Sequence, residues 1–158
     1  MEKIFKEGKN FIDYDFGKYN IKNECCYREL LCSSKFKYNS IEHTEFIRSD
    51  LSYVIFESCQ FFNCKLVKCE LFETEFYNCS FNNVIFSDCL FSKSIINDCL
   101  FNNINIMCSW FDELILKNIN IKNIIGVDTA TIKSININNK LIYGQDAISY
   151  INNNYISN

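Results

Sequence analysis

The chain has 158 residues, 48% of them apolar and 16% aromatic, and its 16 Lys or Arg and 19 Asp or Glu give a formal net charge of −3. This length fits a single domain, and the composition is that of a globular chain, which excludes a disordered or collagen-like protein. A near-balance of charge argues against binding nucleic acid by neutralising its phosphates, so we expect no nucleic acid among its partners.

The start of the chain and its cysteines indicate the cellular compartment in which the protein is expected. The stretch from Met1 to Gly8 lacks the apolar core of a secretory signal peptide. No segment approaches the roughly 18 consecutive apolar residues of a membrane span. The chain contains ten Cys, which without a signal peptide fits a reducing environment. We therefore expect a cytoplasmic protein with no membrane partner.

Residues 1–33 carry only half of the pattern that dominates the rest of the chain. A large apolar residue or a cysteine stands at every fifth position, at Phe11, Phe16, Ile21, Cys26 and Leu31. Two residues before each of these come Lys9, Tyr14, Tyr19, Glu24 and Glu29. Because an unpaired carboxylate is costly in a dry core, we expect an N-terminal cap or irregular first coil, and the stretch Glu24–Leu31 allows a short helix.

Every fifth residue from 36 to 121 is large and apolar without exception, which is a repeat rather than chance. This large column consists of Phe36, Ile41, Phe46, Leu51, Phe56, Phe61, Leu66, Leu71, Phe76, Phe81, Phe86, Phe91, Ile96, Phe101, Ile106, Phe111, Leu116 and Ile121. A second column, two residues earlier in each repeat, is mostly small and carries no charge. This small column consists of Ser34, Asn39, Thr44, Ser49, Val54, Cys59, Cys64, Cys69, Thr74, Cys79, Val84, Cys89, Ser94, Cys99, Ile104, Ser109, Leu114 and Ile119.

A period of five excludes both a regular helix and a flat strand. Five steps around an α-helix rotate by roughly 140°, so the apolar stripe would wander around the cylinder. An odd period on a strand turns successive large residues to opposite faces. The chain must instead turn once per repeat in the same sense, and a square coil with one repeat on each side places both columns inside.

The motif of a small residue, then Asn or Asp, then Leu or Phe and two variable residues resembles the pentapeptide-repeat family. The resemblance covers about residues 34–123, and we assign residues 34–125 to the repeat. It implies an all-β solenoid, namely a right-handed quadrilateral β-helix with an N-terminal cap and a short C-terminal β/helix cap. In several members of the family the C-terminal segment makes a symmetric dimer, so the resemblance also implies a homodimer.

Asparagine is unusually frequent, with 22 residues, and many of them share one place in the repeat. Asn and Asp tolerate left-handed backbone better than other residues with a side chain. We therefore predict corners of the coil two residues after the large column, as at Asn63, Asn78, Asn83, Asp88, Asp98, Asn103, Asn118 and Asn123.

Gly126 ends the repeat, and residues 126–158 are expected to form the C-terminal cap. The stretches Thr131–Ile137 and Lys140–Tyr143 resemble two short strands around Asn138 and Asn139, and Gln145–Asn152 a short helix with Asp146 near its start. On one side of that helix lie the candidates for cap or dimer contacts, Ile148, Ile151 and Tyr155.

Most of the cysteines are explained by the repeat. Six belong to the small column, where residues twenty apart stack, so we expect one ladder of Cys59, Cys79 and Cys99 and another of Cys69 and Cys89. Buried Cys acts as a small inert hydrophobe, and the spacings do not match a zinc site. The candidates for reactive thiols lie off this column and are Cys25, Cys26, Cys32 and Cys108.

Candidates for catalysis are lacking in the sequence. His43, the single histidine, falls on an outward position, so no nucleophile–base–orienter set is formed around it. The four glycines lie at 8, 17, 126 and 144 and make no phosphate loop. We expect a non-enzymatic protein with no catalytic residue, no cofactor and no metal; a thiol- or metal-binding protein is the weaker alternative.

The outward residues divide among four faces, and one of them combines acidic with aromatic side chains. On the face of Leu51, Leu71, Phe91 and Phe111, five acidic residues stand against Lys93 alone. We define the acidic aromatic face as Asp50, Tyr53, Glu70, Phe72, Glu73, Trp110, Asp112 and Glu113. Aromatic residues are enriched at interface hot spots and charge steers association, so we predict that this face binds another protein.

The sequence therefore predicts a protein–protein interaction scaffold whose partner it does not name. The resemblance supplies an alternative, because Qnr and MfpA types of the family mimic duplex DNA and bind the type II topoisomerases DNA gyrase and topoisomerase IV, protecting them from quinolones. Duplex DNA carries one negative charge per ~1.7 Å, and a net charge of −3 is a weak match to it.

Overall fold

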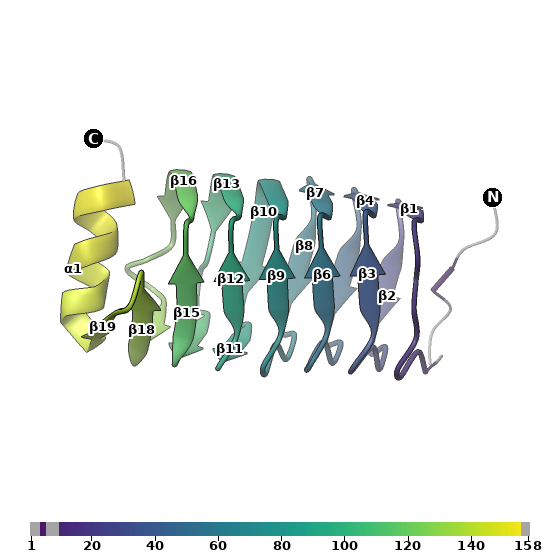
Figure 1. Ribbon diagram of the computed structural model, residues 1–158, viewed down its shortest axis with the longest axis horizontal. Coiled ribbons are helices and arrows are strands. Elements are labelled where there is room, and N and C mark those ends of the chain that lie inside the picture. Colours follow the sequence, from purple (N-terminus) through teal and green to yellow (C-terminus); the bar gives the residue numbers. More distant parts are fainter. Residues whose placement is uncertain (1–3, 6–9, 156–158) are drawn as a thin grey trace.

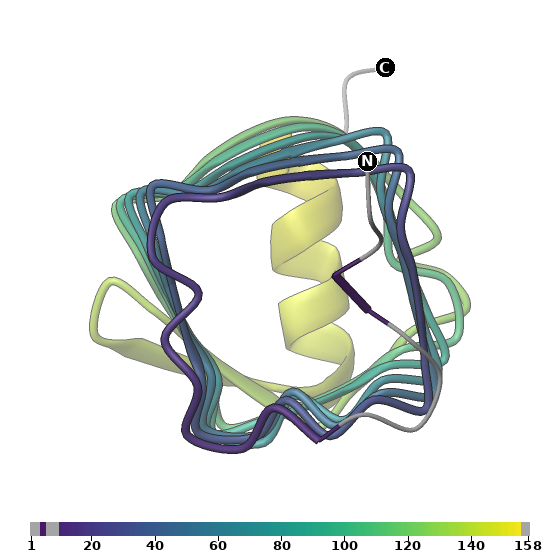
Figure 2. The same cartoon turned by 90° about the vertical axis from the view of Figure 1, so that its right-hand side faces the viewer.

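The computed structural model describes residues 4–5 and 10–155 and is a β-solenoid of about six turns that ends in one helix (Figure 1). Seen along its axis, the coil is square (Figure 2). The predicted fold class is thereby confirmed. Residues 1–3 and 6–9 of the expected N-terminal cap and residues 156–158 of the C-terminal cap lie outside the described residues.

Short strands form the walls of the coil in three sheets. The first contains β1 (Asn20–Lys22), β4 (Ser40–Glu42), β7 (Gln60–Phe62), β10 (Ser80–Ser87), β13 (Leu100–Asn105), β16 (Asn120–Ile125), β8 (Lys65–Val67), β5 (Glu45–Ile47) and β2 (Cys25–Tyr27). The second contains β11 (Leu90–Ser92), β14 (Trp110–Asp112) and β17 (Thr131–Ile132). The third contains β3 (Lys35–Lys37), β6 (Ile55–Glu57), β9 (Glu75–Tyr77), β12 (Ile95–Asn97), β15 (Leu114–Lys117), β18 (Ser134–Ile137) and β19 (Lys140–Tyr143).

Up to Ile125, each turn of the coil pairs in parallel with the next in a register of twenty residues. Phe36 lies beside Phe56, which lies beside Phe76. Parallel strands are spaced by ~4.8 Å, so equivalent residues of successive turns form ladders along the axis.

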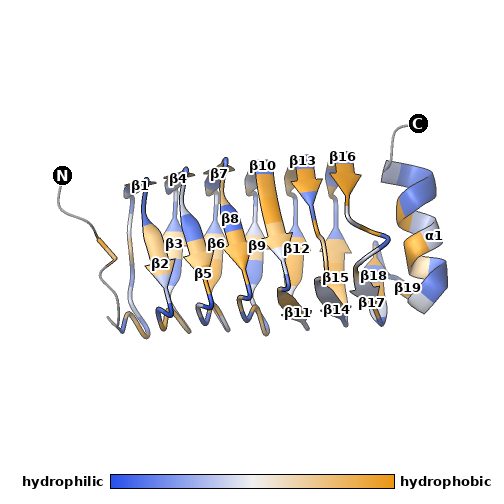
Figure 3. Ribbon diagram, turned by 180° about the vertical axis from the view of Figure 1, so that it is seen from behind, coloured by the Kyte–Doolittle hydropathy of each residue, from blue (hydrophilic) through white to orange (hydrophobic). Residues whose placement is uncertain are grey.

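The large column fills the interior of the coil. The rings of Phe36, Phe56 and Phe76 stack with centroids 4.8 and 5.0 Å apart. A second ladder runs through Phe61, Phe81 and Phe101 at 4.7 Å per step. Figure 3 shows apolar colour along most of the strands from β8 to β16. Burial of these side chains is the main force that holds the turns together.

Toward the C-terminus the interior is less completely filled. There the ladder of Phe36, Phe56 and Phe76 continues with Ile96 and Leu116. Phe76, Ile96 and Leu116 help to line an apolar cavity of about 70 Å³. Ile151 of α1 (Gly144–Tyr155) lines the same cavity from the end of the coil.

The corners have the left-handed backbone that the asparagines predict. Asn63, Asn83 and Asp98 have φ angles of 51°, 53° and 55°. The same conformation also occurs at Tyr53 and Glu73, with φ of 60° and 50°. An L-residue other than Asn or Asp has to bear roughly 1–2 kcal/mol for this backbone, so the coil geometry is imposed on these positions by the surrounding pairing.

The expected helix over Glu24–Leu31 is wrong, because this stretch belongs to the coil. Cys25–Tyr27 forms β2 and pairs with β5, and backbone pairing extends upstream to a bridge between Asn10 and Leu30. Pairing with the next turn therefore outweighs local helix propensity. Glu24 and Glu29 occupy small-column positions at only 5% and 0% exposure, and Glu24 Oε1 accepts a hydrogen bond from the Ile4 amide at 3.3 Å.

The C-terminal elements follow the sequence closely. The hairpin β18–β19 is antiparallel and turns at Asn138 and Asn139, with φ of 48° and 68°. The first expected strand is divided at Lys133 into β17 and β18. Helix α1 crosses the end of the square coil (Figure 2). Gly126 has a φ of 82°, and a Cβ there would lie 2.6 Å from Asn105 Oδ1, so only glycine fits where the repeat ends.

Candidate protein-interaction face

The acidic aromatic face consists of three parallel columns on the side of the coil that carries β11 and β14. The first column is a ladder of Asp50, Glu70, Leu90 and Trp110, joined by parallel bridges and strand pairs. The second contains Phe72, Ser92 and Asp112, and the third contains the corner residues Tyr53, Glu73, Lys93 and Glu113. The structure thus places all eight predicted residues on one side of the coil.

Exposed or partly exposed apolar and aromatic side chains lie in all three columns of this face. Trp110 is 44% exposed and lies beside Leu90, which is 49% exposed. Nearer the N-terminus, the ring of Tyr53 meets the ring of Phe72 edge-on, with centroids 5.4 Å apart. Lys93 Nζ lies 5.9 Å from the centroid of Phe72. A rigid coil therefore presents large apolar groups to the solvent in fixed positions.

The carboxylates of the face differ in how they are held. Asp112 Oδ2 pairs with Lys133 Nζ at 2.8 Å, and Asp112 Oδ1 accepts a hydrogen bond from Ser134 Oγ at 3.0 Å. The hydrogen bond from Lys133 and then that from Ser134 lower the pKa of Asp112 below its ordinary value. Asp50 Oδ1 accepts the Ser52 amide at 2.9 Å. The carboxylates of Asp112 and Asp50 are therefore less available to a partner than those of Glu73 and Glu113 at the corner.

Two members of the face were missing from the sequence prediction. Lys133 enters it because β17 pairs Trp110 with Thr131, a spacing of twenty-one residues, so that counting by fives fails beyond Gly126. Leu90 has the same outward position as Trp110 one turn earlier, and the five-residue count alone could have identified it. Lys133 reduces the excess of negative charge on the face. Leu90 adds a second exposed large apolar side chain beside Trp110.

A basic corner borders the acidic aromatic face on its other side. Arg28, Arg48 and Lys68 occupy corner positions with φ of 55°, 53° and 55°. Arg48 stands two residues before Asp50, and Lys68 stands two residues before Glu70. The acidic excess of the face is therefore concentrated at the opposite corner, around Glu73 and Glu113.

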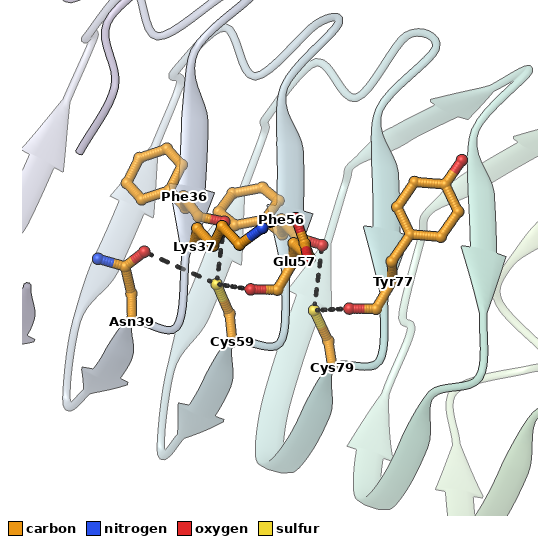
Figure 4. Close-up of polar contacts among 8 residues, drawn as sticks. All are labelled: Phe36, Lys37, Asn39, Phe56, Glu57, Cys59, Tyr77 and Cys79. Carbon is orange, nitrogen blue, oxygen red and sulfur yellow. Dashed lines mark hydrogen bonds and ion pairs between the residues drawn. The ribbon is translucent and has the colours of Figure 1, made fainter. Parts of the chain in front are cut away.

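The small-column cysteines are buried hydrogen-bond donors. Cys59 Sγ donates to the Phe36 carbonyl at 3.4 Å, and Cys79 Sγ donates to the Phe56 carbonyl at 3.3 Å (Figure 4). Thr74 Oγ1 donates in the same way to the Leu51 carbonyl at 2.8 Å. This shared bond to the preceding turn explains why Cys, Ser and Thr can take one another's place in this column.

Hydrogen bonds with the thiols of Cys79 and Cys89 lower the pKa of Cys59, Cys99 and Cys69, whereas burial has the opposite effect on other thiols. Burial raises the pKa of the Cys64 thiol, and together with the carboxylates of Glu29 and Glu24 it raises the pKa of Cys26 well above its ordinary value. Cys26 is fully buried in the large column, so its prediction as a reactive thiol is wrong.

The other three candidates are more accessible, since Cys25 and Cys108 are exposed and Cys32 is partly buried. All ten cysteines are free. Among the residues that the structure describes, no group of three or more His, Cys, Asp or Glu is arranged to hold a metal ion. His43 is an exposed corner residue whose ring meets Phe62 edge-on at 5.7 Å.

The three candidates on the C-terminal helix pack within their own chain. Ile151 is 6% exposed in the core, and Ile148 and Tyr155 lie partly buried against it. They close the end of the coil, and a contact with a second copy stays a prediction. No helix within the described ranges is long and apolar enough to cross a membrane.

Comparison with known proteins adds structural neighbours only. No family model matches the sequence, and no curated protein matches it. HetL, a pentapeptide repeat protein involved in heterocyst differentiation regulation from the cyanobacterium Nostoc sp. strain PCC 7120, is similar over 90% of this chain and 65% of its own, with 9% identity and a TM-score of 0.44.

Two further solved structures are similar to parts of this chain. Trypsin-treated QnrB1, a plasmid-mediated fluoroquinolone resistance protein, is similar over 78% of this chain and 74% of its own, with 14% identity and a TM-score of 0.41. Rfr23, a pentapeptide repeat protein from the cyanobacterium Cyanothece 51142, is similar over 73% of this chain and 90% of its own, with 12% identity and a TM-score of 0.24. The fold of this chain is established by its strand pairing and five-residue period rather than by these likenesses.

Proposed function

We propose that this protein is a non-enzymatic protein–protein interaction scaffold that binds its partner through the acidic aromatic face. The observation that carries the proposal is the ladder of Leu90 and Trp110, two large apolar side chains that are 49% and 44% exposed on adjacent strands. Exposed apolar groups that lie side by side and are rimmed by charge are typical of interaction sites. The coil holds them in place, so binding costs little ordering of the scaffold.

The charge pattern does not favour mimicry of duplex DNA or a type II topoisomerase as the partner. Along the first column the acidic pair Asp50 and Glu70 is followed by Leu90 and Trp110, and along the third Lys93 separates Glu73 from Glu113. Four turns of coil span ~19 Å, over which a duplex carries about 11 negative charges. These two columns supply four carboxylates and one ammonium over that span, and the acidic stripe is interrupted in both.

The proposal is tested by removing the apolar anchor while the coil is kept. The tagged protein is used to capture partners from an extract of its source cells, and these are quantified by mass spectrometry. In one double variant, Leu90→Ala is combined with Trp110→Ala. In the matched control, Phe62→Ala is combined with Leu100→Ala, which truncates two exposed apolar residues on another side.

We expect a captured partner that is reduced at least tenfold by the first double variant and retained by the control. Circular dichroism checks that both variants keep the β-coil. Equal capture by the wild type and both variants would contradict the proposed face.

A further inference from the structure

The four corners of the coil share one backbone conformation but differ in chemistry. At one corner four successive turns have asparagine, with φ between 51° and 62° at Asn63, Asn83, Asn103 and Asn123. These amides bond to one another along the axis at 2.9–3.1 Å. Asparagine suits this backbone, and the side chains satisfy each other, so this corner has a structural explanation.

The corner of the acidic aromatic face retains residues that suit this backbone poorly. Tyr53, Glu73, Lys93 and Glu113 have φ of 60°, 50°, 55° and 53°. None of them is Asn, Asp or Gly, although the same coil accepts Asn at the equivalent positions of the diagonally opposite corner. The basic corner bears the same backbone cost at Arg28, Arg48 and Lys68, so this cost belongs to the coil, and what distinguishes the corner of the acidic aromatic face is its pair of exposed carboxylates.

The carboxylates at this corner are available to a partner. Within the described part of the chain, the side chains of Glu73 and Glu113 form no ion pair and accept no hydrogen bond. The cations nearby are already engaged, because Lys93 lies against Phe72 and Lys133 pairs with Asp112.

A groove runs along the axis beside these corner residues. Its first part is lined by Tyr53, Ile55, Glu73, Glu75, Lys93 and Ile95. One turn further on, a second part is lined by Glu113, Ile115, Leu141 and Tyr143 together with the ion pair of Asp112 and Lys133. Ile95 pairs with Ile115 on adjacent strands, so the two parts are consecutive.

The floor and the wall of the groove differ in polarity. Along the floor, the ladder of Ile55, Glu75, Ile95 and Ile115 presents three half-buried apolar side chains and one carboxylate. Along the wall stand Glu73 and Glu113, separated by two turns of the coil, or ~10 Å; Lys93 stands between them with its Nζ 5.9 Å from the centroid of Phe72. In an extended peptide, side chains on one face recur every ~6.8 Å, so lysine or arginine residues on that face reach both carboxylates.

We propose that this corner groove binds an extended polypeptide segment in which basic and apolar side chains alternate. The basic side chains pair with Glu73, Glu75 and Glu113, while the apolar ones cover the isoleucine floor. The inference rests on the proposed function and specifies the chemistry of the partner segment. It assigns the acidic residues to a groove at the edge of the face, on the far side of the second column from the Leu90–Trp110 anchor.

The test uses a variant that removes charge and at the same time relieves the backbone. Asn replaces both glutamates in the double variant Glu73→Asn with Glu113→Asn, which we expect to unfold at a higher urea concentration than the wild type. The control, Asp88→Asn with Asp98→Asn, makes the same change in net charge at two other corner positions with φ of 54° and 55°. The probe is a fluorescent peptide of alternating Lys and Leu, and its counterpart contains Glu in place of Lys.

Fluorescence anisotropy at low salt measures the affinity of the full-length protein for each peptide. We expect the Lys–Leu peptide to bind about tenfold more weakly to the Glu73/Glu113 variant and with unchanged affinity to the Asp88/Asp98 control. The Glu–Leu peptide is expected not to bind. Equal weakening by the two variants, or equal binding of the two peptides, would overturn the inference.

The same variants separate this inference from the proposed function. A cellular partner that is lost with the Leu90/Trp110 variant but retained by the Glu73/Glu113 variant would overturn the groove and leave the proposed face intact. A partner retained by both variants would overturn both proposals.

Discussion

Replacing Ile96 with Phe should stabilise the C-terminal half of the coil. Ile96 follows the stacked rings of Phe36, Phe56 and Phe76 in one ladder, and it helps to line the apolar cavity of about 70 Å³. The substitution Ile96→Phe extends the ladder of rings by one turn and places the larger side chain where the core has space.

The expected gain follows from the cavity and from ring stacking. Phe exceeds Ile by roughly 20 Å³, which at ~24 cal/mol per Å³ of cavity corresponds to ~0.5 kcal/mol. A stacked aromatic pair adds ~0.5–1.5 kcal/mol beyond the area that it buries. We expect the free energy of unfolding to rise by about 1 kcal/mol, because part of each contribution is lost to adjustment of the neighbouring side chains.

Urea denaturation followed by circular dichroism measures this gain. The matched control is Ile41→Phe, the same substitution at a large-column position that is fully buried and does not line the cavity. Overpacking there is expected to cost ~1–3 kcal/mol. If Ile96→Phe destabilised the protein as much as Ile41→Phe, the explanation of the cavity by the Phe-to-Ile change in the ladder would be refuted.

Three further outcomes are expected. An aromatic thiol reagent should react rapidly with the exposed Cys25 and Cys108, and the buried cysteines should react only in denaturant; rapid modification of more than three thiols in the native protein would contradict the register of the small column. In Lys133→Met, the pKa of Asp112 should rise toward its ordinary value in an NMR titration, and an unchanged pKa would show that the ion pair is absent in solution. Because the pKa of Asp112 is lowered in the folded protein, the stability that the wild type gains from this carboxylate is present near neutral pH. That stability is lost as the pH falls through the folded pKa of Asp112. Phe81→Asp should abolish the cooperative β-sheet signal, because the loss of a buried ring costs ~3–5 kcal/mol and an unpaired charge takes its place; a folded variant would mean that this side chain faces water.

The repeat could be predicted from the sequence because each of its features has one geometric solution. The unbroken large column from Phe36 to Ile121 requires a turn in every repeat, and the corner asparagines require left-handed backbone at known positions. The stacking of Cys79 on Cys99, whose Sγ accepts the Cys79 amide at 3.4 Å, also follows from the period. These are local rules repeated many times, so errors do not accumulate along the coil.

The short helix expected over Glu24–Leu31 was wrong because the residues of this turn depart from the rule that the rest of the coil obeys. Glu24 and Glu29 occupy small-column positions where a carboxylate is unfavourable, and the sequence alone gave no reason to place them inside. Strand pairing between successive turns, seen for Cys25 with Glu45, determines the structure there. The decisive interactions lie twenty residues away, beyond the reach of a local helix argument.

The candidate site could be predicted in part. Counting by fives placed its eight residues on one side of the coil, but it gave neither the groove beside Glu73 and Glu113 nor the ion pair of Asp112 with Lys133. The groove depends on how far the side chains of adjacent repeats project at a corner. The ion pair depends on one extra residue in the turn after Gly126, which shifts the register from twenty to twenty-one.

Because the register is twenty residues, this coil can be shortened or lengthened by whole turns of twenty residues without moving any side chain to another side. Removing residues 60–79 would join Cys59 to Ser80 and leave every remaining side chain on its original side, with Phe81 now stacked on Ile41. Removing only five residues would instead rotate all later repeats by a quarter of a turn and separate Glu113 from the side that carries Tyr53. Insertions and deletions between relatives of this coil should therefore come in multiples of twenty wherever a surface is shared across the deletion, and in other multiples of five where each turn acts alone.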